Sequence, residues 1–294
     1  MKLNQIGSIK QSMGEVVLSK LQRLNDANSD VDSNAVTIVG AGCGDIDMLT
    51  IKAARAIAAA QAIVYDNLVS KDILQLAADD CDMYYMGKCF GKPSATQEQI
   101  NHKLLQLSQK GKVVIRLKGG DPNVFGRGSE EALFLAKNGV KSKFVAGVTA
   151  ALGCAASAGI PLTHRKVARS VTFMTGHLCD DTAIEWAGLL AAKSTLVFYM
   201  GKERAADIAH GLLQAGAKLS LPVAFISNGA RDNQSIVSTS VQNMVDVAST
   251  ISVDGPTLLI VGEVVGIGQE LAQWLTACDV ESDGKSDAFE RAYG

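Results

Sequence analysis

The sequence predicts an α/β fold of two domains, and three observations support this prediction. The chain has 294 residues, and a typical domain has about 150. Hydrophobic residues make up 47% and charged residues 20%, so the chain can bury apolar cores and is not intrinsically disordered. From Val36 onward, short apolar runs rich in valine and isoleucine alternate with alanine-rich or amphipathic segments of helical length. This alternation is typical of strands and helices packed in layers.

Nine apolar runs have the length and composition of strands. They span residues 36–39, 62–65, 83–86, 113–117, 143–146, 171–174, 195–200, 223–226 and 257–261. Nearly all are followed by glycine or a small polar residue. Ligands of open α/β sheets bind beyond the carboxyl ends of the strands. We therefore expect the residues that follow these runs, from Gly40 to Gly262, to gather at one site.

Three helices are predicted from the residues at their ends. Thr50 can cap the alanine-rich segment that follows it, and Thr96 with a glutamine three residues later has the pattern of a capping box. Gly111 can end this second helix. The third is expected over residues 149–158, with Gly159 after it.

Polar ends and a glycine-rich middle segment divide the chain. We predict an N-terminal arm (residues 1–34, with at most a short helix around 16–24), an N-terminal α/β domain (35–147), a C-terminal α/β domain (148–280) and a flexible tail (281–294). The alanine- and glycine-rich residues 147–160 are the best candidate for the connection between the two domains.

The composition excludes several classes of partner. Lysine and arginine number 28 against 30 aspartates and glutamates, which gives a net charge of −2 and no basic field for nucleic acid. The longest uncharged stretch, residues 144–163, contains a proline and several glycines, so we predict no membrane span.

The cysteines and the N-terminal sequence indicate the cellular compartment of the protein. The six cysteines form no CxxC pair and have no metal-ligand spacing, so we expect free thiols in a reducing compartment and no metal site. The N-terminal sequence MKLNQIGSIKQSMGEVV lacks the apolar run of a signal peptide. A cytoplasmic location is therefore predicted.

The first glycine loop, VGAGCGD at residues 39–45, follows a predicted strand, and Asp66 ends the next one. A dinucleotide site is the first interpretation of such a loop. However, Asp45 stands where the third glycine of that motif belongs, and an acid there would repel a pyrophosphate. A dinucleotide oxidoreductase remains an alternative, and a different ligand is favoured.

Two further loops carry polar groups suited to a ligand. In KGGDPNVFGRG, residues 118–128, Asp121 can accept a hydrogen bond from a ribose or an ammonium group, although it can equally serve a tight turn. In GIPLTHRK, residues 159–166, the side chains form either a clamp for carboxylates or a solvated basic loop. The cations available for anion contacts near the strand ends are Lys118, Arg127, His164 and Arg165.

Five segments together resemble the tetrapyrrole C-methyltransferases, and within them the uroporphyrinogen-III C-methyltransferases. The segments are GAGCGDIDMLTIKA, AIVYDNLVS, VVIRLKGGDPNVFGRGSEEA, GVTAALGCAASAGIPLTHR and TLVFYMG. They occur in the family's order and intervals and cover residues 36–275. The resemblance implies two α/β domains of the tetrapyrrole methylase type with the active-site cleft between them, and usually a homodimer.

The same resemblance implies an activity and a set of site residues. The activity is transfer of two methyl groups from S-adenosyl-L-methionine to uroporphyrinogen III, which gives precorrin-2 for sirohaem or cobalamin biosynthesis and leaves S-adenosyl-L-homocysteine. Asp66 is implied as proton acceptor and Lys88 as proton donor. The implied donor-binding residues are Cys43, Gly119, Gly120, Asp121, Val124, Thr149, Ala150, Met200, Gly229 and Thr257.

Several alternatives stay open. Asp66 can instead cap the segment after it, Lys88 can instead anchor a substrate carboxylate, and Met200 can instead be part of the core. The chain departs from the family pattern at Cys43 and Ala146, where proline is usual, at Asn123, where an aromatic is usual, and at Ala230, where threonine is usual. Other possible functions are methylation of a later corrin precursor and non-catalytic tetrapyrrole carriage.

Overall fold

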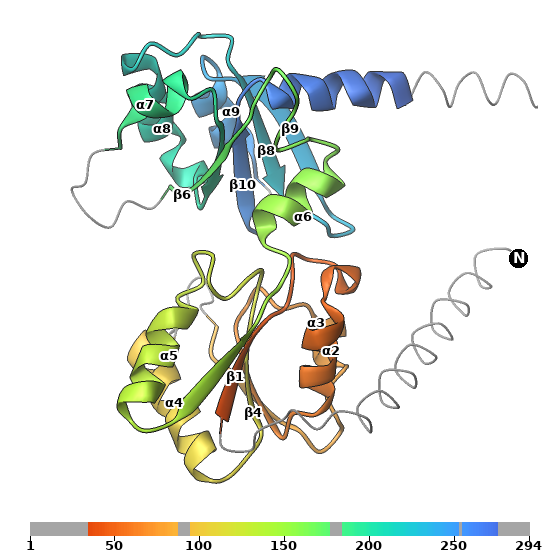
Figure 1. The fold of residues 1–294 in the computed structure, drawn as a ribbon. Coiled ribbons are helices and arrows are strands. Elements are labelled where there is room, and N and C mark those ends of the chain that lie inside the picture. The colour runs from red at the N-terminus through yellow and green to blue at the C-terminus, as the bar shows by residue number, and fades with distance from the viewer. Residues whose placement is uncertain (1–34, 88–94, 177–183, 253–254, 276–294) are drawn as a thin grey trace, which may run out of the picture. The chain divides into compact units, whose positions relative to one another are not determined.

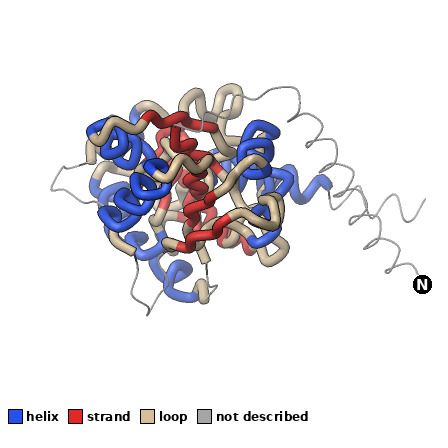
Figure 2. The backbone as a smooth tube through the Cα atoms, turned by 90° about the horizontal axis from the view of Figure 1, so that it is seen from below, coloured by secondary structure: helices blue, strands red, loops and turns tan. Residues whose placement is uncertain are grey.

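The computed structural model describes residues 35–87, 95–176, 184–252 and 255–275 (Figure 1). The chain divides into two compact units, Met1–Thr149 and Ala150–Gly294. The described part of each unit holds a five-stranded sheet, and Figure 2 shows the strands with helices on either side. The predicted α/β class is confirmed. The predicted arm, with its short helix around residues 16–24, and the predicted tail lie outside the described residues.

The sheet of the first unit is entirely parallel. Its strands have the order β3-β2-β4-β1-β5. They are β1 (Ala35–Gly40), β2 (Ala62–Tyr65), β3 (Asp82–Tyr85), β4 (Val114–Lys118) and β5 (Lys141–Val145). The register pairs Gly40 with Lys118 and Tyr65 with Leu117. The loops that follow β1, β2 and β4 therefore start side by side at one edge of the sheet.

Helices cover both faces of this sheet. Figure 1 shows α2 (Ile51–Ala58) and α3 (Lys71–Leu74) on one side and α4 (Gln97–Gln109) and α5 (Gly128–Lys137) on the other. Because successive side chains of a strand point to opposite faces, β1 contributes to two apolar clusters. Val39 packs in the cluster that contains residues of α2 and α3, whereas Val36 and Ile38 pack in the cluster that contains residues of α4 and α5. The interior strands β1 and β2 are apolar on both faces for this reason.

The helix ends predicted for this unit are present. The Thr50 hydroxyl accepts a hydrogen bond from the backbone N–H three residues later, at the start of α2. Thr96 and Gln99 form the predicted capping box of α4. Gly111, with φ of 70°, follows the end of α4 in the left-handed conformation that glycine favours.

The sheet of the second unit is mixed. Its order is β6-β7-β10-β8-β9, in which only β6 and β7 are parallel neighbours. The strands are β6 (Val171–Thr175), β7 (Thr195–Tyr199), β8 (Pro222–Ser227), β9 (Ser235–Ser240) and β10 (Thr257–Val261). Since β10 runs antiparallel to both its neighbours, its start lies at the edge where β7 and β8 end.

The helices of the second unit surround an apolar core. They are α6 (Ala150–Ser157), α7 (Trp186–Ala191), α8 (Ala205–Gln214), α9 (Met244–Thr250) and the helical residues 264–275. The third predicted helix is α6, and Gly159 follows it with φ of 64°. The core between α8, α9 and the sheet is built on fully buried Phe198, Phe225 and Leu212.

One strand was not among the nine predicted runs. β9 has the sequence SIVSTS, with alternating half-buried and exposed positions in its first part. It is an edge strand held by an antiparallel pairing with β8. The serines give it too little apolar character to stand out in the sequence, so its pairing decides its structure.

No helix among the described residues is long and apolar enough to cross a membrane. Among the same residues, no three or more histidine, cysteine, aspartate or glutamate side chains form a group suited to a metal ion.

Candidate functional site

The loops after β1, β4 and β5 pack backbone against backbone. The Gly120 N–H donates to the Gly42 carbonyl at 2.7 Å, and the Gly42 N–H donates to the Gly120 carbonyl at 3.2 Å. A Cβ atom on Gly40 would lie 2.5 Å from the Gly120 oxygen, and one on Gly147 would lie 2.2 Å from it. Such approaches leave no room for a side chain at Gly40 or Gly147. The three loops therefore form one rim at the carboxyl ends of the strands.

Asp121 holds two of these loops together. Its Oδ1 accepts from the Asn123 N–H at 2.8 Å, and its Oδ2 accepts from the Gly147 N–H at 3.1 Å. The turn role considered from the sequence is thus present. An ionised carboxylate offers about four acceptor positions, so a half-buried Asp121 that uses two of them keeps capacity for a ligand hydroxyl or ammonium group.

Asp66 lies at the same rim, directly after β2. Its Oδ1 accepts from the Leu68 N–H at 3.1 Å, so the turn-capping alternative describes one of its contacts. Its Oδ2 lies 3.6 Å from Nη2 of Arg116, and the side chain is 24% exposed. Gly119 packs beside this turn, since a Cβ there would lie 2.5 Å from the Leu68 Cβ. Asp66 is therefore held on two sides while part of it faces solvent.

A cluster of buried charges lies behind Asp66, and Arg116 and Glu131 in it were not among the predicted site residues. Arg116 is 2% exposed and Glu131 is fully buried, with Arg116 Nε 3.1 Å from Glu131 Oε1. Lys118 Nζ lies 2.8 Å from the same oxygen. An arginine inside the apolar run VVIRLK was the available signal, because buried cations need a paired carboxylate.

The environment of Lys118 corrects one expectation. Burial lowers the pKa of the Lys118 ammonium from its ordinary value, the Arg116 guanidinium lowers it further, and Glu131 opposes both. Lys118 is 5% exposed and bonded to Glu131. It is therefore part of an internal ion pair rather than one of the exposed anion contacts expected from the sequence. Arg127 is exposed, and both its Nε and Nη2 donate to Glu130, at 2.8 and 2.7 Å.

Four predicted donor-binding residues gather at one edge of the second sheet. Met200 and Gly229 follow β7 and β8, and Thr257 begins β10 beside Ser227, with 2.8 Å between the two hydroxyl oxygens. The Tyr199 hydroxyl accepts from the Ala151 N–H at 3.1 Å, which holds the start of α6, where Ala150 lies, at this edge.

The backbone at this edge has unusual conformations. Met200, Asn228 and Ala230 have φ of 54°, 51° and 57°, values that non-glycine residues rarely adopt. Strained residues of this kind cluster at functional sites. Met200 is also 51% exposed. The core-packing alternative for Met200 is therefore wrong.

The expectation that Gly262 joins these residues is also wrong. Because β10 is antiparallel to β8, Gly262 follows the far end of β10, where its N–H donates to the carbonyl at the start of β8 (Pro222) at 2.9 Å. The direction of β10 depends on its antiparallel neighbours, whereas the expectation assumed parallel strands throughout.

The basic segment of the second unit forms a hollow of about 430 Å³. Its lining residues are Thr163, His164, Arg165, Lys166, Ala168 and Arg169. A bridge between His164 and Ala168 closes the loop. His164 and Arg165 are exposed, so the structure leaves open both the clamp and the solvated-loop interpretation.

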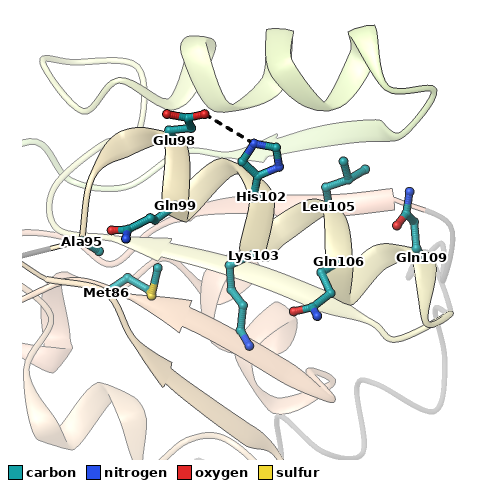
Figure 3. A pocket seen from close by; sticks show the side chains of 9 residues that line it. All are labelled: Met86, Ala95, Glu98, Gln99, His102, Lys103, Leu105, Gln106 and Gln109. Atoms are coloured by element: carbon teal, nitrogen blue, oxygen red, sulfur yellow. Dashed lines mark ion pairs between the residues drawn. The ribbon is translucent and has the colours of Figure 1, made fainter.

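Another hollow, of about 840 Å³, runs along α4 in the first unit (Figure 3). Figure 3 shows it lined mostly by side chains of that helix, together with Met86 and Ala95, and with a Glu98–His102 ion pair of 3.8 Å. It contains none of the predicted site residues.

The remaining predicted residues have the following places. Cys43 and Val124 are half-buried in loops of the first unit, and Thr149 is buried at its end. Lys88, the implied proton donor, lies outside the described residues.

Comparison with known proteins assigns the family. The family described as Tetrapyrrole (Corrin/Porphyrin) Methylases matches residues 35–245. The chain belongs to this family. This confirms the resemblance found in the sequence.

The relatives of this tetrapyrrole methylase chain include siroheme synthases. It is 42% identical over 260 residues to siroheme synthase 2 of Yersinia enterocolitica, covering 88% of this chain and 54% of that protein. It is 46% identical over 236 residues to siroheme synthase of Salmonella paratyphi B, covering 80% of this chain and 51% of that protein. The chain thus spans about half the length of these curated relatives.

A solved structure matches over nearly its whole length. The crystal structure of uroporphyrin-III C-methyl transferase from Thermus thermophilus, complexed with S-adenyl homocysteine, is similar with a TM-score of 0.68 and 36% identity. The match covers 79% of this chain and 99% of that one. The two-domain tetrapyrrole methyltransferase fold is therefore confirmed.

Proposed function

We propose that this chain methylates uroporphyrinogen III with S-adenosyl-L-methionine, in two successive transfers that give precorrin-2 for sirohaem or cobalamin biosynthesis. The observation that carries the proposal is the match to 99% of the Thermus methyltransferase, a structure solved with the demethylated donor. The siroheme synthase relatives support the same substrate.

The donor-binding residues are assigned within each unit. In the first unit they are Cys43, Gly119, Gly120, Asp121, Val124 and Thr149, and in the second Ala150, Met200, Gly229 and Thr257. The chemistry of the two edges fits such a ligand. Asp121 keeps acceptor capacity for an ammonium or ribose hydroxyl, and Met200 presents an exposed, polarisable thioether.

The bound donor would supply an electrophilic methyl group on a sulfonium, and the protein would supply alignment and proton handling. Correct alignment of two reactants is worth about 7–11 kcal/mol of the barrier. The pyrrole carbon of an unoxidised tetrapyrrole is already electron-rich, so the chain needs no nucleophile of its own. The methylated carbon already carries a side chain and has no hydrogen, so the proton that balances each methyl transfer leaves from elsewhere on the macrocycle. Asp66, fixed on two sides and partly exposed at the rim, accepts this proton. General base assistance of this kind contributes roughly 10²–10⁴-fold.

Mass spectrometry of the anaerobic reaction tests this proposal. The chain, S-adenosyl-L-methionine and uroporphyrinogen III are expected to give a product heavier by two methyl groups, and Asp66→Asn is expected to slow its formation while it still binds the donor. Unchanged substrate mass at saturating donor would contradict the proposal. Tetrapyrrole binding without donor binding would instead favour the carrier alternative, and turnover of only a later corrin precursor would favour the other methyltransferase.

The homodimer and the cytoplasmic location also belong to this proposal. Both come from the family resemblance and the sequence. Sedimentation equilibrium of the purified chain tests the first, and cell fractionation tests the second.

A further inference from the structure

A buried ion-pair cluster connects α5 to the rim where Asp66 lies. The Glu131 Oε1 atom accepts from Arg116 Nε at 3.1 Å, from Lys118 Nζ at 2.8 Å and from Gln97 Nε2 at 3.2 Å. These donors come from β4 and α4. One carboxylate oxygen on α5 therefore fixes both buried cations of β4.

The Arg116 guanidinium is held by three acceptors in addition to its contact with Asp66. Its Nε donates to Glu131, and its Nη1 donates to the carbonyls of Val64 at 3.2 Å and Leu117 at 3.1 Å. Its Nη2 then lies 3.6 Å from the Asp66 Oδ2. Because a guanidinium is planar and rigid, fixing Nε and Nη1 also fixes where Nη2 points.

We propose that Glu131 is a positioning residue for Asp66 and acts through Arg116. The inference rests on the proposed role of Asp66 as proton acceptor. Glu131 fixes the position of the Arg116 guanidinium. This guanidinium faces one carboxylate oxygen of Asp66, and the Leu68 N–H donates to the other. The Asp66 carboxylate is thereby kept in one orientation at the strand-end rim.

A change in the net charge of this cluster has an effect on Asp66 that a change in packing alone would not produce. The charged groups that meet here are Arg116 and Lys118 from β4, Glu131 from α5 and Asp66 after β2, and Gln97 from α4 is neutral. Glu130 on α5 interacts with Lys118 as well. The four charges that meet sum to zero. If Glu131 loses its charge, the described residues offer no other buried carboxylate to balance Arg116 and Lys118 beside Asp66.

Carboxyl ¹³C NMR of the full-length chain with labelled aspartate measures the effect directly, with the Asp66 signal assigned from Asp66→Asn. The chemical shift of the Asp66 carboxyl carbon at neutral pH is expected to change in Glu131→Gln, because the Arg116 guanidinium that faces this carboxylate loses its charged partner. It is expected to change in Arg116→Gln as well, and also in Lys118→Met if Arg116→Gln does not fold. An unmoved Asp66 signal in the folded variants would overturn the proposal.

The turnover number kcat provides a second test of the proposal. Glu131→Gln is expected to lower kcat by about ten- to a hundredfold, a part of what acid–base assistance contributes, and to move the acidic limb of the kcat profile to lower pH. The dissociation constant for S-adenosyl-L-methionine is expected to stay unchanged. A loss of donor affinity that accounts for the whole loss of rate would overturn the positioning role.

The matched control is Glu98→Gln, an exposed glutamate on α4 whose ion pair is with His102. It is expected to change neither the Asp66 carboxyl signal nor kcat. A wild-type chain that methylates nothing would defeat the proposed function, whereas the NMR arm would still decide whether Glu131 controls Asp66.

Discussion

The two units of this protein differ in the charged groups that they bury. In the first unit, Arg116, Lys118 and Glu131 are buried beside the strand ends, whereas the buried polar groups described in the second unit are Thr195, Ser227 and Asn228, all neutral. Burying a charge is unfavourable unless it is paired and hydrogen-bonded. The first unit therefore holds a set of paired charges next to Asp66, and we assign proton transfer to this unit.

In the second unit, unusual backbone conformations lie next to an apolar core. The non-glycine residues with positive φ at its strand ends, Met200, Asn228 and Ala230, lie on a mixed sheet with an apolar core. Such conformations persist only where the surrounding packing determines them. Substitutions in the first unit are thus expected to act through charge, and those in the second through packing.

The largest expected effect concerns Asp121. Asp121→Ala removes a charged acceptor and two hydrogen bonds that tie the loops after β4 and β5 together. We expect the dissociation constant for S-adenosyl-L-methionine to rise about a hundredfold, equivalent to about 2.8 kcal/mol. Isothermal titration calorimetry measures it, with Arg169→Ala as the control at an exposed cation. Equal losses in the two variants would count against the assigned site.

A smaller effect tests packing in the second unit. A Cβ on Gly229 would lie 2.2 Å from the Cys154 Sγ on α6. Gly229→Ala is expected to lower the free energy of unfolding by about 1 to 2 kcal/mol through overpacking, and Cys154→Ala in the same chain is expected to restore part of it.

Urea denaturation at neutral pH measures these changes. Gly188→Ala is the matched control, because a Cβ at Gly188 meets nothing within 4 Å. Equal stability of Gly229→Ala and Gly188→Ala would show that the edge of the second sheet is less tightly packed than its geometry indicates.

The smallest effect is expected at a half-buried ion pair beside the first sheet. The hydrogen bond from Lys112 holds the pKa of the Asp82 carboxyl below its ordinary value of 3.8. An acid with a depressed pKa stabilises the fold above its unfolded-state pKa, and this contribution is lost as the pH falls through the lower folded-state value. Wild type is therefore expected to be slightly more stable than Asp82→Asn at pH 6.

The melting-temperature difference between these two chains is expected to close as the pH falls below 3.8. Scanning calorimetry from pH 6 to pH 2 follows it, and added salt is expected to shrink it because both side chains are partly exposed to solvent. A difference independent of pH would mean that the charges of Asp82 and Lys112 do not interact, and that only the buried pairs of this unit matter.

Local signals accounted for much of what could be predicted. Thr50, the Thr96–Gln99 capping box and the glycines after α4 and α6 act within a few residues of themselves, so the sequence alone located those helix ends. The strand β9 was not predicted, because its sequence is polar and its structure depends on its pairing with β8. Gly262 was misplaced because strand direction is a property of the whole sheet.

The sequence by itself determined the α/β class, most strands and the family, since these depend on residue types at fixed spacings. Only the tertiary structure decided that Lys118 turns inward to Glu131, that Arg116 reaches Asp66, and that Met200 is exposed. The physical reason is that the partners of a buried charge lie on different elements, here β4, α5 and the turn after β2. No spacing along one segment encodes their distances, which the packing of the helices on the sheet fixes.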